Sequence, residues 1–163
     1  MPNTPQKVST CLWFDTQAEE AANLYTSLFE NSSLKVASRY GKNGRMPEGL
    51  AMVVLFTLAG TEFMALNGGP MFKHSEASST TVQCDSQAEI DRLWAALTAD
   101  GGKESQCGWL KDRFGLSWQI VSNRMGEFMS SGDPARSARV MAAMMQMVKI
   151  DVAKLEAAYH GEN

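Results

Sequence analysis

The sequence predicts an α+β fold in which two similar modules, each a strand, a helix and three further strands, are followed by C-terminal helices. Residues 14–19 (Phe-Asp-Thr-Gln-Ala-Glu) and 84–89 (Cys-Asp-Ser-Gln-Ala-Glu) repeat one another with four identities and one Thr/Ser exchange. Each copy is followed by a helical pattern and three strand-like runs. A chance match between two helix starts is the alternative, but the shared order of elements favours an internal duplication.

Such modules place the helix on one face of a mainly antiparallel sheet, so the other face is free to curl around a cavity. The chain has 163 residues, 44% hydrophobic and 20% charged, which is the balance of one globular domain. We predict a single domain over 1–163 with an open, cavity-enclosing mixed sheet. Its parts are a first βαβββ module at 8–69, a second at 79–122 and a helical arm at 133–160.

Charge and patterning argue against several classes of function. The net charge is −3 and no stretch is strongly basic, which argues against a nucleic-acid partner. The longest apolar run, residues 50–59, is far shorter than the roughly 20 residues of a membrane helix. The N-terminal residues lack the apolar segment of a signal peptide, which predicts a cytoplasmic protein. Cys11, Cys84 and Cys107 have no metal-site spacing and are expected to be reduced core thiols.

The first module begins with a strand at 8–14 that runs directly into a helix. Thr16 and Glu19 have the spacing of a capping box, in which each side chain satisfies a backbone N–H at the helix start. The helix is expected to end near Asn31, and strands are expected at 35–40, 50–58 and 62–66. Apolar residues at helical spacing predict one buried helix face, made of Ala18, Ala22, Tyr25 and Phe29. The sequence assigns no role to the loop at 39–49.

The second module repeats this order. Ser86 and Glu89 form the second expected capping box, and a helix follows with Leu93, Trp94 and Leu97 on its buried face. Three strands are then expected, at 103–107, 109–111 and 117–122.

The C-terminal segment is expected to form two helices. Asp133 is the predicted N-cap of the first helix, with Pro134 at its first position, and the second helix starts at Asp151 and stops at Gly161. An apolar stripe of core or dimer-packing residues is expected at Val140, Met141, Met144, Met145 and Val148. An adaptable methionine-rich binding surface is the alternative. We expect an arm that covers the sheet or a partner subunit, and hence a homodimer.

Three motifs carry a resemblance to a known family. They are Cys11-Leu12-Trp13-Phe14-Asp15, Leu66-Asn67-Gly68-Gly69-Pro70 with Phe72, and the stretch from Cys107 to Val121. In them the chain resembles the PhnB-like branch of the vicinal oxygen chelate superfamily, labelled 3-demethylubiquinone-9 3-methyltransferase-like, from about Val8 to Tyr159. The superfamily includes glyoxalase I, extradiol dioxygenases, and bleomycin and fosfomycin resistance proteins. The resemblance implies paired βαβββ modules.

In enzymes of this superfamily a divalent metal is held by side chains from the first and last strands of each module. Those positions fall near Ser9, Ser79 and Gln119 in this chain. Two hydroxyls and an amide are weak ligands for a divalent ion. No cofactor and no catalytic metal are therefore predicted. Glu62, His74 and Gln119 are the remaining candidate ligands if a metal is bound.

The two histidines of the chain are candidate functional residues. His74 is either a mobile acid/base over the cavity or a solvent-exposed loop histidine, and the second is favoured. His160 is expected to be a charge at a helix C-terminus.

Methyl transfer, which the family label implies, usually needs a glycine-rich turn after the first strand to bind S-adenosylmethionine. Here the helix starts at once with Asp15.

Strand alternation predicts which side chains face the cavity. Trp118 alternates with Gln119 along its strand and is therefore expected to point away from the cavity, toward the helices. Lys111, Asp112 and Arg113 are expected to brace a turn as an ion cluster; contact of Lys111 or Arg113 with an anionic ligand is the alternative. The predicted lining is Ser9, Cys11, Trp13, Asn67, Ser79, Gln83, Trp109 and Gln119, with Thr81, Ser117 and Val121 beside them.

A lining of this kind suits a flat or amphipathic organic ligand held by stacking and a few hydrogen bonds. We predict a homodimeric protein that binds a small organic molecule without a catalytic metal and without methyltransferase activity. The alternative is an enzyme of the superfamily: a metal-dependent or acid/base lyase, isomerase or dioxygenase, or a 3-demethylubiquinone methyltransferase as the family label suggests.

Overall fold

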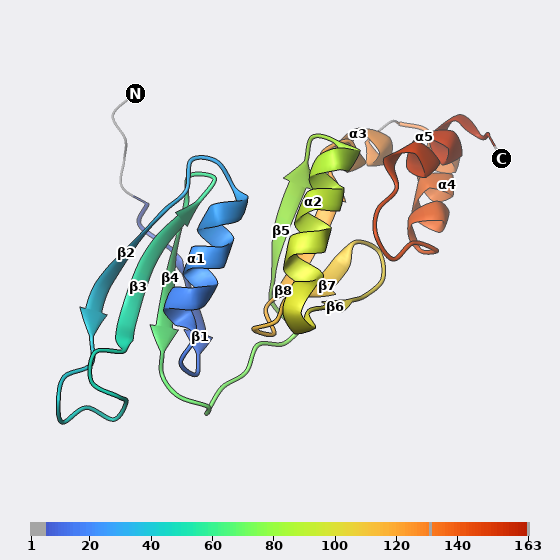
Figure 1. Ribbon diagram of the computed structural model, residues 1–163. Helices are drawn as coiled ribbons and strands as arrows, with labels where there is room; N and C mark the ends of the chain where they lie inside the picture. The colour runs from blue at the N-terminus through green and yellow to red at the C-terminus, as the bar shows by residue number, and fades with distance from the viewer. Residues whose placement is uncertain (1–5, 131, 163) are drawn as a thin grey trace. The chain divides into compact units, whose positions relative to one another are not determined.

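The computed structural model describes residues 6–130 and 132–162. The chain divides into two compact units, Met1–Lys73 and His74–Asn163. Each unit holds one four-stranded sheet with a helix on one of its faces (Figure 1). The predicted α+β fold with two βαβββ modules and C-terminal helices is confirmed.

The first unit contains one parallel and two antiparallel strand pairs. Its sheet has the order β1-β4-β3-β2, and β1 lies parallel to β4. Buried side chains of α1 and the sheet, among them Phe14, Tyr25 and Val54, form its core. The elements are β1 (Thr10–Phe14), α1 (Ala18–Leu28), β2 (Ser33–Arg39), β3 (Ala51–Leu58) and β4 (Thr61–Asn67).

The second unit repeats this arrangement. Its sheet has the order β5-β8-β7-β6 with β5 parallel to β8, so corresponding strands occupy corresponding places in the two sheets. Trp118 and Ile120 of β8 are buried on the side of α2 with Ile90 and Leu93. The elements are β5 (Ser79–Cys84), α2 (Gln87–Thr98), the short helix η1 (Ala99–Gly101), β6 (Lys103–Glu104), β7 (Trp109–Lys111) and β8 (Ser117–Ser122).

The two helix starts of the repeat are capped in different ways. Ser86 caps α2 as predicted, because its Oγ accepts a hydrogen bond from Glu89 N at 3.2 Å. The Thr16–Glu19 capping box is wrong. The N-cap of α1 is Gln17, which makes no side-chain capping bond, and the N–H of Ala18 is instead bonded to Asn67 Oδ1 at 2.8 Å.

Two predicted element boundaries are corrected by backbone geometry. Helix α1 ends at Leu28 because Phe29 adopts an extended backbone (φ −126°, ψ 139°). Strand β6 ends at Glu104, short of the predicted residue 107, because the chain turns back toward β7 directly after it. The turn is closed by the Trp109 N–H, which donates to Gln106 O at 3.0 Å, and Cys107 within it has a positive φ of 58°.

The described residues after β8 form α3 (Met125–Met129), α4 (Pro134–Met144) and α5 (Val152–His160), of which α3 precedes the arm and was not predicted. Asp133 and Asp151 are the N-caps of α4 and α5, as expected, and each accepts backbone N–H bonds of its own first turn. Gly161 ends α5 in the left-handed conformation at φ 76°, which glycine adopts without a steric penalty.

The predicted methionine stripe is only partly packed. Val140 is buried, as a core position should be, but Met141, Met145 and Val148 are exposed (37, 55 and 44%). Helix α4 ends at Met144, so Met145 and Val148 lie beyond its last turn and do not continue the helical face. The stripe is therefore not a core stripe within the unit.

The expectation of three core thiols is wrong for two of them. Cys84 is buried, Cys11 is exposed and Cys107 is half-buried, and all three are free.

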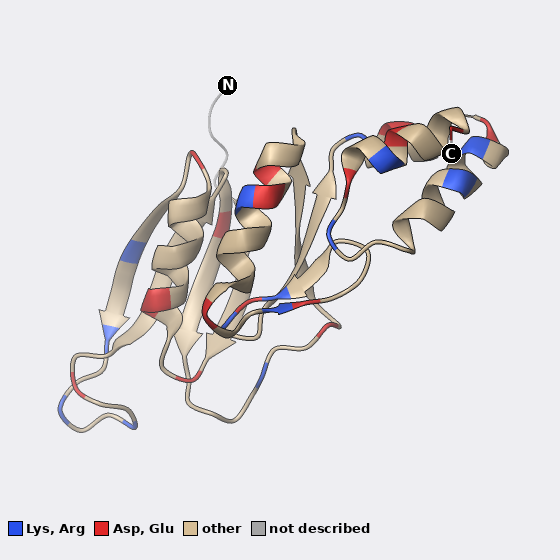
Figure 2. Ribbon diagram, turned by 45° about the vertical axis from the view of Figure 1, so that its right-hand side comes forward, with Lys and Arg blue, Asp and Glu red and all other residues tan. Residues whose placement is uncertain are grey.

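Lys, Arg, Asp and Glu residues lie on the helices, the loops and strands β2, β4, β6 and β7, whereas β1, β3, β5 and β8 carry none (Figure 2). Among the described residues, no helix is long and apolar enough to cross a membrane.

Candidate binding faces on the two sheets

Each sheet has one face packed under its helix and a second face that carries most of the predicted lining residues. In the first unit Leu12 and Phe14 of β1 are buried, whereas the alternate residues Cys11 and Trp13 are exposed and half-buried. The strand register sets Trp13 beside Leu66 and Cys11 beside Met64. This face of the first sheet is thus largely apolar.

Trp13 is held in place by the Gly68-Gly69 turn. Its indole Nε1 donates to the carbonyl oxygen of Gly69 at 2.8 Å, and the ring of Phe72 meets it edge-on at 5.0 Å. A Cβ on Gly68 would lie 2.2 Å from the Trp13 ring, so only glycine permits this approach. The motif is therefore an aromatic corner at the end of β1.

Ser9 lies in a shallow hollow of about 250 Å³ at the other end of the first sheet. Lys35, Leu55, Thr57 and Glu62 also line it. Glu62, one of the candidate metal ligands, thus shares a hollow with a predicted lining residue. The hollow contains one carboxylate and one ammonium group beside hydroxyls.

Asn67, one of the predicted lining residues, lies in the packed interior of the first unit. Its side chain is completely buried, its Oδ1 accepts from Ala18 N at 2.8 Å, and its Nδ2 donates to Ala51 O at 2.9 Å. Both ends of the amide are therefore engaged in holding α1 and β3 to the end of β4.

In the second unit the lining residues form rows across three strands. Trp109 of β7, Gln119 of β8 and Thr81 of β5 are register partners, with Gln83 beside Val121 in the next row. The side chains of Trp109 and Gln119 are half-buried, and those of Thr81 and Gln83 are exposed. This face is polar, with one large aromatic ring.

Two polar contacts organise this face. Gln119 Nε2 donates to Ser79 Oγ at 2.8 Å, which joins β8 to β5 through side chains. Lys111 Nζ forms an ion pair with Glu76 Oε1 at 2.5 Å, and the hydrogen bond from Lys111 lowers the pKa of the Glu76 carboxyl. Glu76 and Lys111 lie far apart along the chain, so no local sequence signal links them.

The expected ion cluster at Lys111, Asp112 and Arg113 is not one cluster. Asp112 does brace the turn, because its Oδ1 accepts from the N–H groups of Phe114 and Leu116 at 2.9 and 3.1 Å. Arg113 pairs with Asp100 and Lys111 with Glu76, so the two cations diverge. Trp118 is buried and donates to Asp112 Oδ2 at 2.9 Å, which confirms its predicted place in the core.

The two histidines differ in environment. His74 is half-buried, with its Nε2 atom buried, so the expectation of a solvent-exposed loop histidine is wrong. His160 is the basic residue in the last turn of α5, as expected.

The donors at the positions of the superfamily's metal ligands do not fit a divalent cation. Gln119 Nε2 donates to Ser79 Oγ and so occupies one of its lone pairs, and Ser9 supplies only a hydroxyl. Within 6–130 and 132–162, no three His, Cys, Asp or Glu side chains gather as a metal site. Neutral hydroxyl and amide oxygens without carboxylate or imidazole bind such ions weakly. We assign no chemical step to a metal at these residues.

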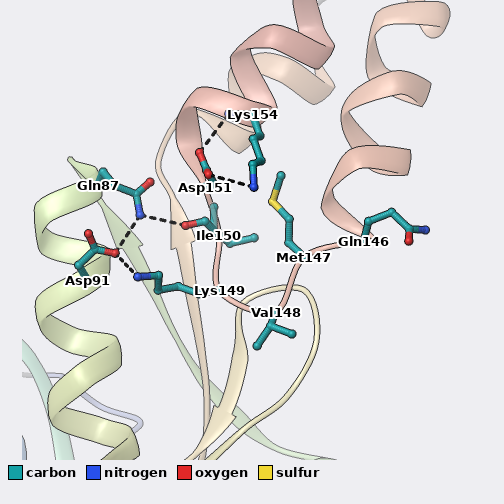
Figure 3. Close-up of a pocket in the computed structure, with 9 residues that line it drawn as sticks. All are labelled: Gln87, Asp91, Gln146, Met147, Val148, Lys149, Ile150, Asp151 and Lys154. Carbon is teal, nitrogen blue, oxygen red and sulfur yellow. Dashed lines mark hydrogen bonds and ion pairs between the residues drawn. The ribbon is translucent and has the colours of Figure 1, made fainter. Parts of the chain in front are cut away.

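A hollow that was not predicted lies in the second unit, between the start of α2 and the segment that joins α4 to α5 (Figure 3). Its volume is about 530 Å³. Gln87 Nε2 donates to Ile150 O and to Asp91 Oδ1, and Lys149 Nζ pairs with Asp91 Oδ1 at 2.5 Å (Figure 3). In the repeat, Gln87 corresponds to Gln17, which is the N-cap of α1. Because Ser86 caps α2, the Gln87 side chain bonds the segment that leads into α5 instead.

The sequence model of the 3-demethylubiquinone-9 3-methyltransferase family matches residues 6–121. The chain belongs to this family. The match ends at residue 121, in the last strand of the second module. It does not include α3, α4 and α5, whereas the resemblance was expected to extend to Tyr159. No curated protein matches the chain.

One solved structure supports the family assignment, and more distant ones share the fold. A PhnB protein from Bacillus cereus is 38% identical, with 72% of this chain and 99% of that chain covered at a TM-score of 0.67. Protein PA1353 from Pseudomonas aeruginosa, 22% identical over 72% of this chain and 97% of that chain at a TM-score of 0.58, shares the fold. The fosfomycin resistance protein FosX from Listeria monocytogenes, 15% identical over 76% and 95% at 0.54, shares the fold. The chain is a member of the vicinal oxygen chelate superfamily.

Proposed function

We propose that the protein binds a small organic molecule on the face of the second sheet formed by Trp109, Gln119 and Thr81. The observation that carries this proposal is the register row of these residues, in which a half-buried aromatic ring lies beside a half-buried amide. Aromatic rings supply stacking area and amides fix orientation by hydrogen bonds, as in ligand sites generally. The opposite face of β8, with Trp118 and Ile120, is fully packed and offers no such surface.

The ligand is bound in this proposal without a catalytic metal. Support comes from the chemistry of the donors, since Ser79 and Gln119 are neutral and already paired with each other. Methyl transfer also has little support, although it is in the family's name. β1 leads into α1 without a glycine-rich turn, and neither sheet has the doubly wound parallel order that binds nucleotide-like cofactors.

The test is a titration of the full chain with two neutral aromatic probes, phenol and nicotinamide, followed by the backbone amide signals of residues 79–83 and 117–121. We expect saturable shifts there, and loss of most of the affinity in Trp109→Leu and in Gln119→Leu. Gln146→Leu changes an exposed amide of the same unit and serves as the matched control. If the control loses as much affinity as Gln119→Leu, or the shifts never saturate, the proposed site is wrong.

We also propose that the protein is a homodimer. The exposed apolar side chains of Met141, Met145 and Val148 on the arm support this, because burial of exposed apolar surface favours association. Multi-angle light scattering should give twice the 17.8 kDa mass of one chain. A stable mass of one chain at micromolar concentration would contradict the dimer.

A further inference from the structure

A second row of side chains crosses the same sheet face next to the Trp109 row. Lys111 of β7 is the register partner of Ser117 of β8, and Ser117 is the partner of Ser79 of β5. The row therefore presents one ammonium and two hydroxyls, which are hydrogen-bond donors for the oxygens of an anion.

Ser117 is the unusual member of this row. Only 1% of its surface is exposed, and its Oγ is a buried atom with no hydrogen-bond partner among the residues that the structure describes. Native proteins leave few buried polar groups unpaired, so each such group needs a physical explanation. An oxygen atom of a ligand would provide the missing partner.

Lys111 is already paired with a carboxylate of the protein itself. The Glu76 carboxylate pairs with its Nζ at 2.5 Å, from a turn that precedes β5. The Glu76 side chain is 66% exposed, whereas that of Lys111 is 33% exposed. An ion pair with one well-solvated partner contributes little net stability. Another anion can therefore replace Glu76 at small cost.

We propose that the Lys111–Ser117–Ser79 row binds an anionic oxygen group of the ligand, a carboxylate or a phosphate, in exchange for the Glu76 carboxylate. This inference rests on the proposed function, because it assigns a charge to the molecule that Trp109 and Gln119 hold. Gln119 orients the Ser79 hydroxyl through its 2.8 Å hydrogen bond and so links the two rows. Glu76 acts as an internal stand-in for the anionic group while the site is free.

The experiment is a titration of the full chain with inorganic phosphate and, separately, with acetate, at ionic strength held constant with sodium chloride. The amide signals of Ser79, Lys111 and Ser117 are followed. We expect saturable shifts, a dissociation constant at least about tenfold higher in Lys111→Met, since a charge-assisted hydrogen bond is lost, and a several-fold lower one in Glu76→Gln. The anion that binds more tightly to the unaltered protein identifies the group.

Lys149→Met is the matched control, because Lys149 is also ion-paired at 2.5 Å, with Asp91 of the same unit. It should bind phosphate and acetate like the unaltered protein. Equal losses in Lys111→Met and Lys149→Met, no gain in Glu76→Gln, or shifts that do not saturate would each overturn the anion row.

Nicotinamide separates the failure of this inference from failure of the proposed function. If nicotinamide binds and neither anion does, the anion row is wrong and the aromatic row remains. If the anions saturate a Lys111-dependent site while nicotinamide and phenol do not bind, the aromatic row fails and the anion row stands alone. If no probe binds, both proposals fail.

Discussion

The side-chain carbonyl of Asn67 accepts a hydrogen bond from the backbone N–H of Ala18 at 2.8 Å, so the last strand of the first sheet caps its helix. In the second module the residue directly before the helix, Ser86, caps α2 with its own side chain. The duplicated modules thus solve the same problem at a helix start with different residues.

Asn67→Ala should lower the free energy of unfolding by about 2–4 kcal/mol, because it removes the helix cap and leaves the buried Ala51 carbonyl unpaired. Urea unfolding followed by circular dichroism measures this change. Asn123→Ala is the control: Asn123 is exposed and its side-chain amide donates to Asp85 Oδ1 at 2.7 Å, so loss of this side chain should cost less than about 1 kcal/mol. Similar losses in the two variants would contradict the capping role.

Burial raises the pKa of the Cys84 thiol to about 12, and Glu89 adds to the shift. Above about pH 9 the unfolded chain releases this proton while the native chain keeps it, so stability falls as pH rises. The slope from this thiol is on the order of 1 kcal/mol per pH unit between about pH 9 and 12. Unfolding midpoints measured at pH 8 to 10.5 should therefore fall less steeply in Cys84→Ala than in the unaltered protein.

Cys107→Ala removes a half-buried thiol and provides the comparison for this pH dependence. It should keep the steep alkaline loss of stability that the unaltered protein shows. Parallel curves for the unaltered protein and Cys84→Ala would show that Cys84 does not carry the slope.

Gln87 fastens the C-terminal arm to the second module. Its Oε1 accepts from Val152 N at 2.9 Å, and its Nε2 donates to Ile150 O at 3.0 Å. We expect Gln87→Ala to speed hydrogen exchange at residues 146–155 by about tenfold or more, since two bonds worth about 1 kcal/mol each are lost. Gln17→Ala, at the equivalent position of the first module, should leave exchange in this segment unchanged. Equal exchange in all three proteins would rule out the fastening.

The sequence predicted the order of elements well because the repeat and the apolar periodicity are local signals. Three helices begin at the expected N-caps Ser86, Asp133 and Asp151, and one ends at Gly161 as expected. These predictions succeeded because a cap acts within a few residues of the chain. Asn67 and Glu76 were missed because their partners are set by tertiary structure: Ala18 lies far from Asn67 along the chain, and Lys111 far from Glu76. Strand alternation correctly placed Trp118 in the core, but could not tell that Asn67 is buried.

Asp112 supports the edge of the proposed binding face from beneath. It is 3% exposed, and its carboxylate accepts from Phe114 N, Leu116 N and Trp118 Nε1. Asp112→Asn puts an amide NH₂ where one of these donors needs an acceptor, and should cost about 2–4 kcal/mol in urea unfolding.

Asp100→Asn is the matched change for this prediction, because Asp100 is 76% exposed and pairs with Arg113 at 3.4 Å. Its loss should be less than about 1 kcal/mol. Because Lys111 precedes Asp112 directly, Asp112→Asn should also weaken phosphate binding at the anion row, whereas Asp100→Asn should not. Unchanged phosphate affinity in a folded Asp112→Asn protein would mean that the turn does not position Lys111.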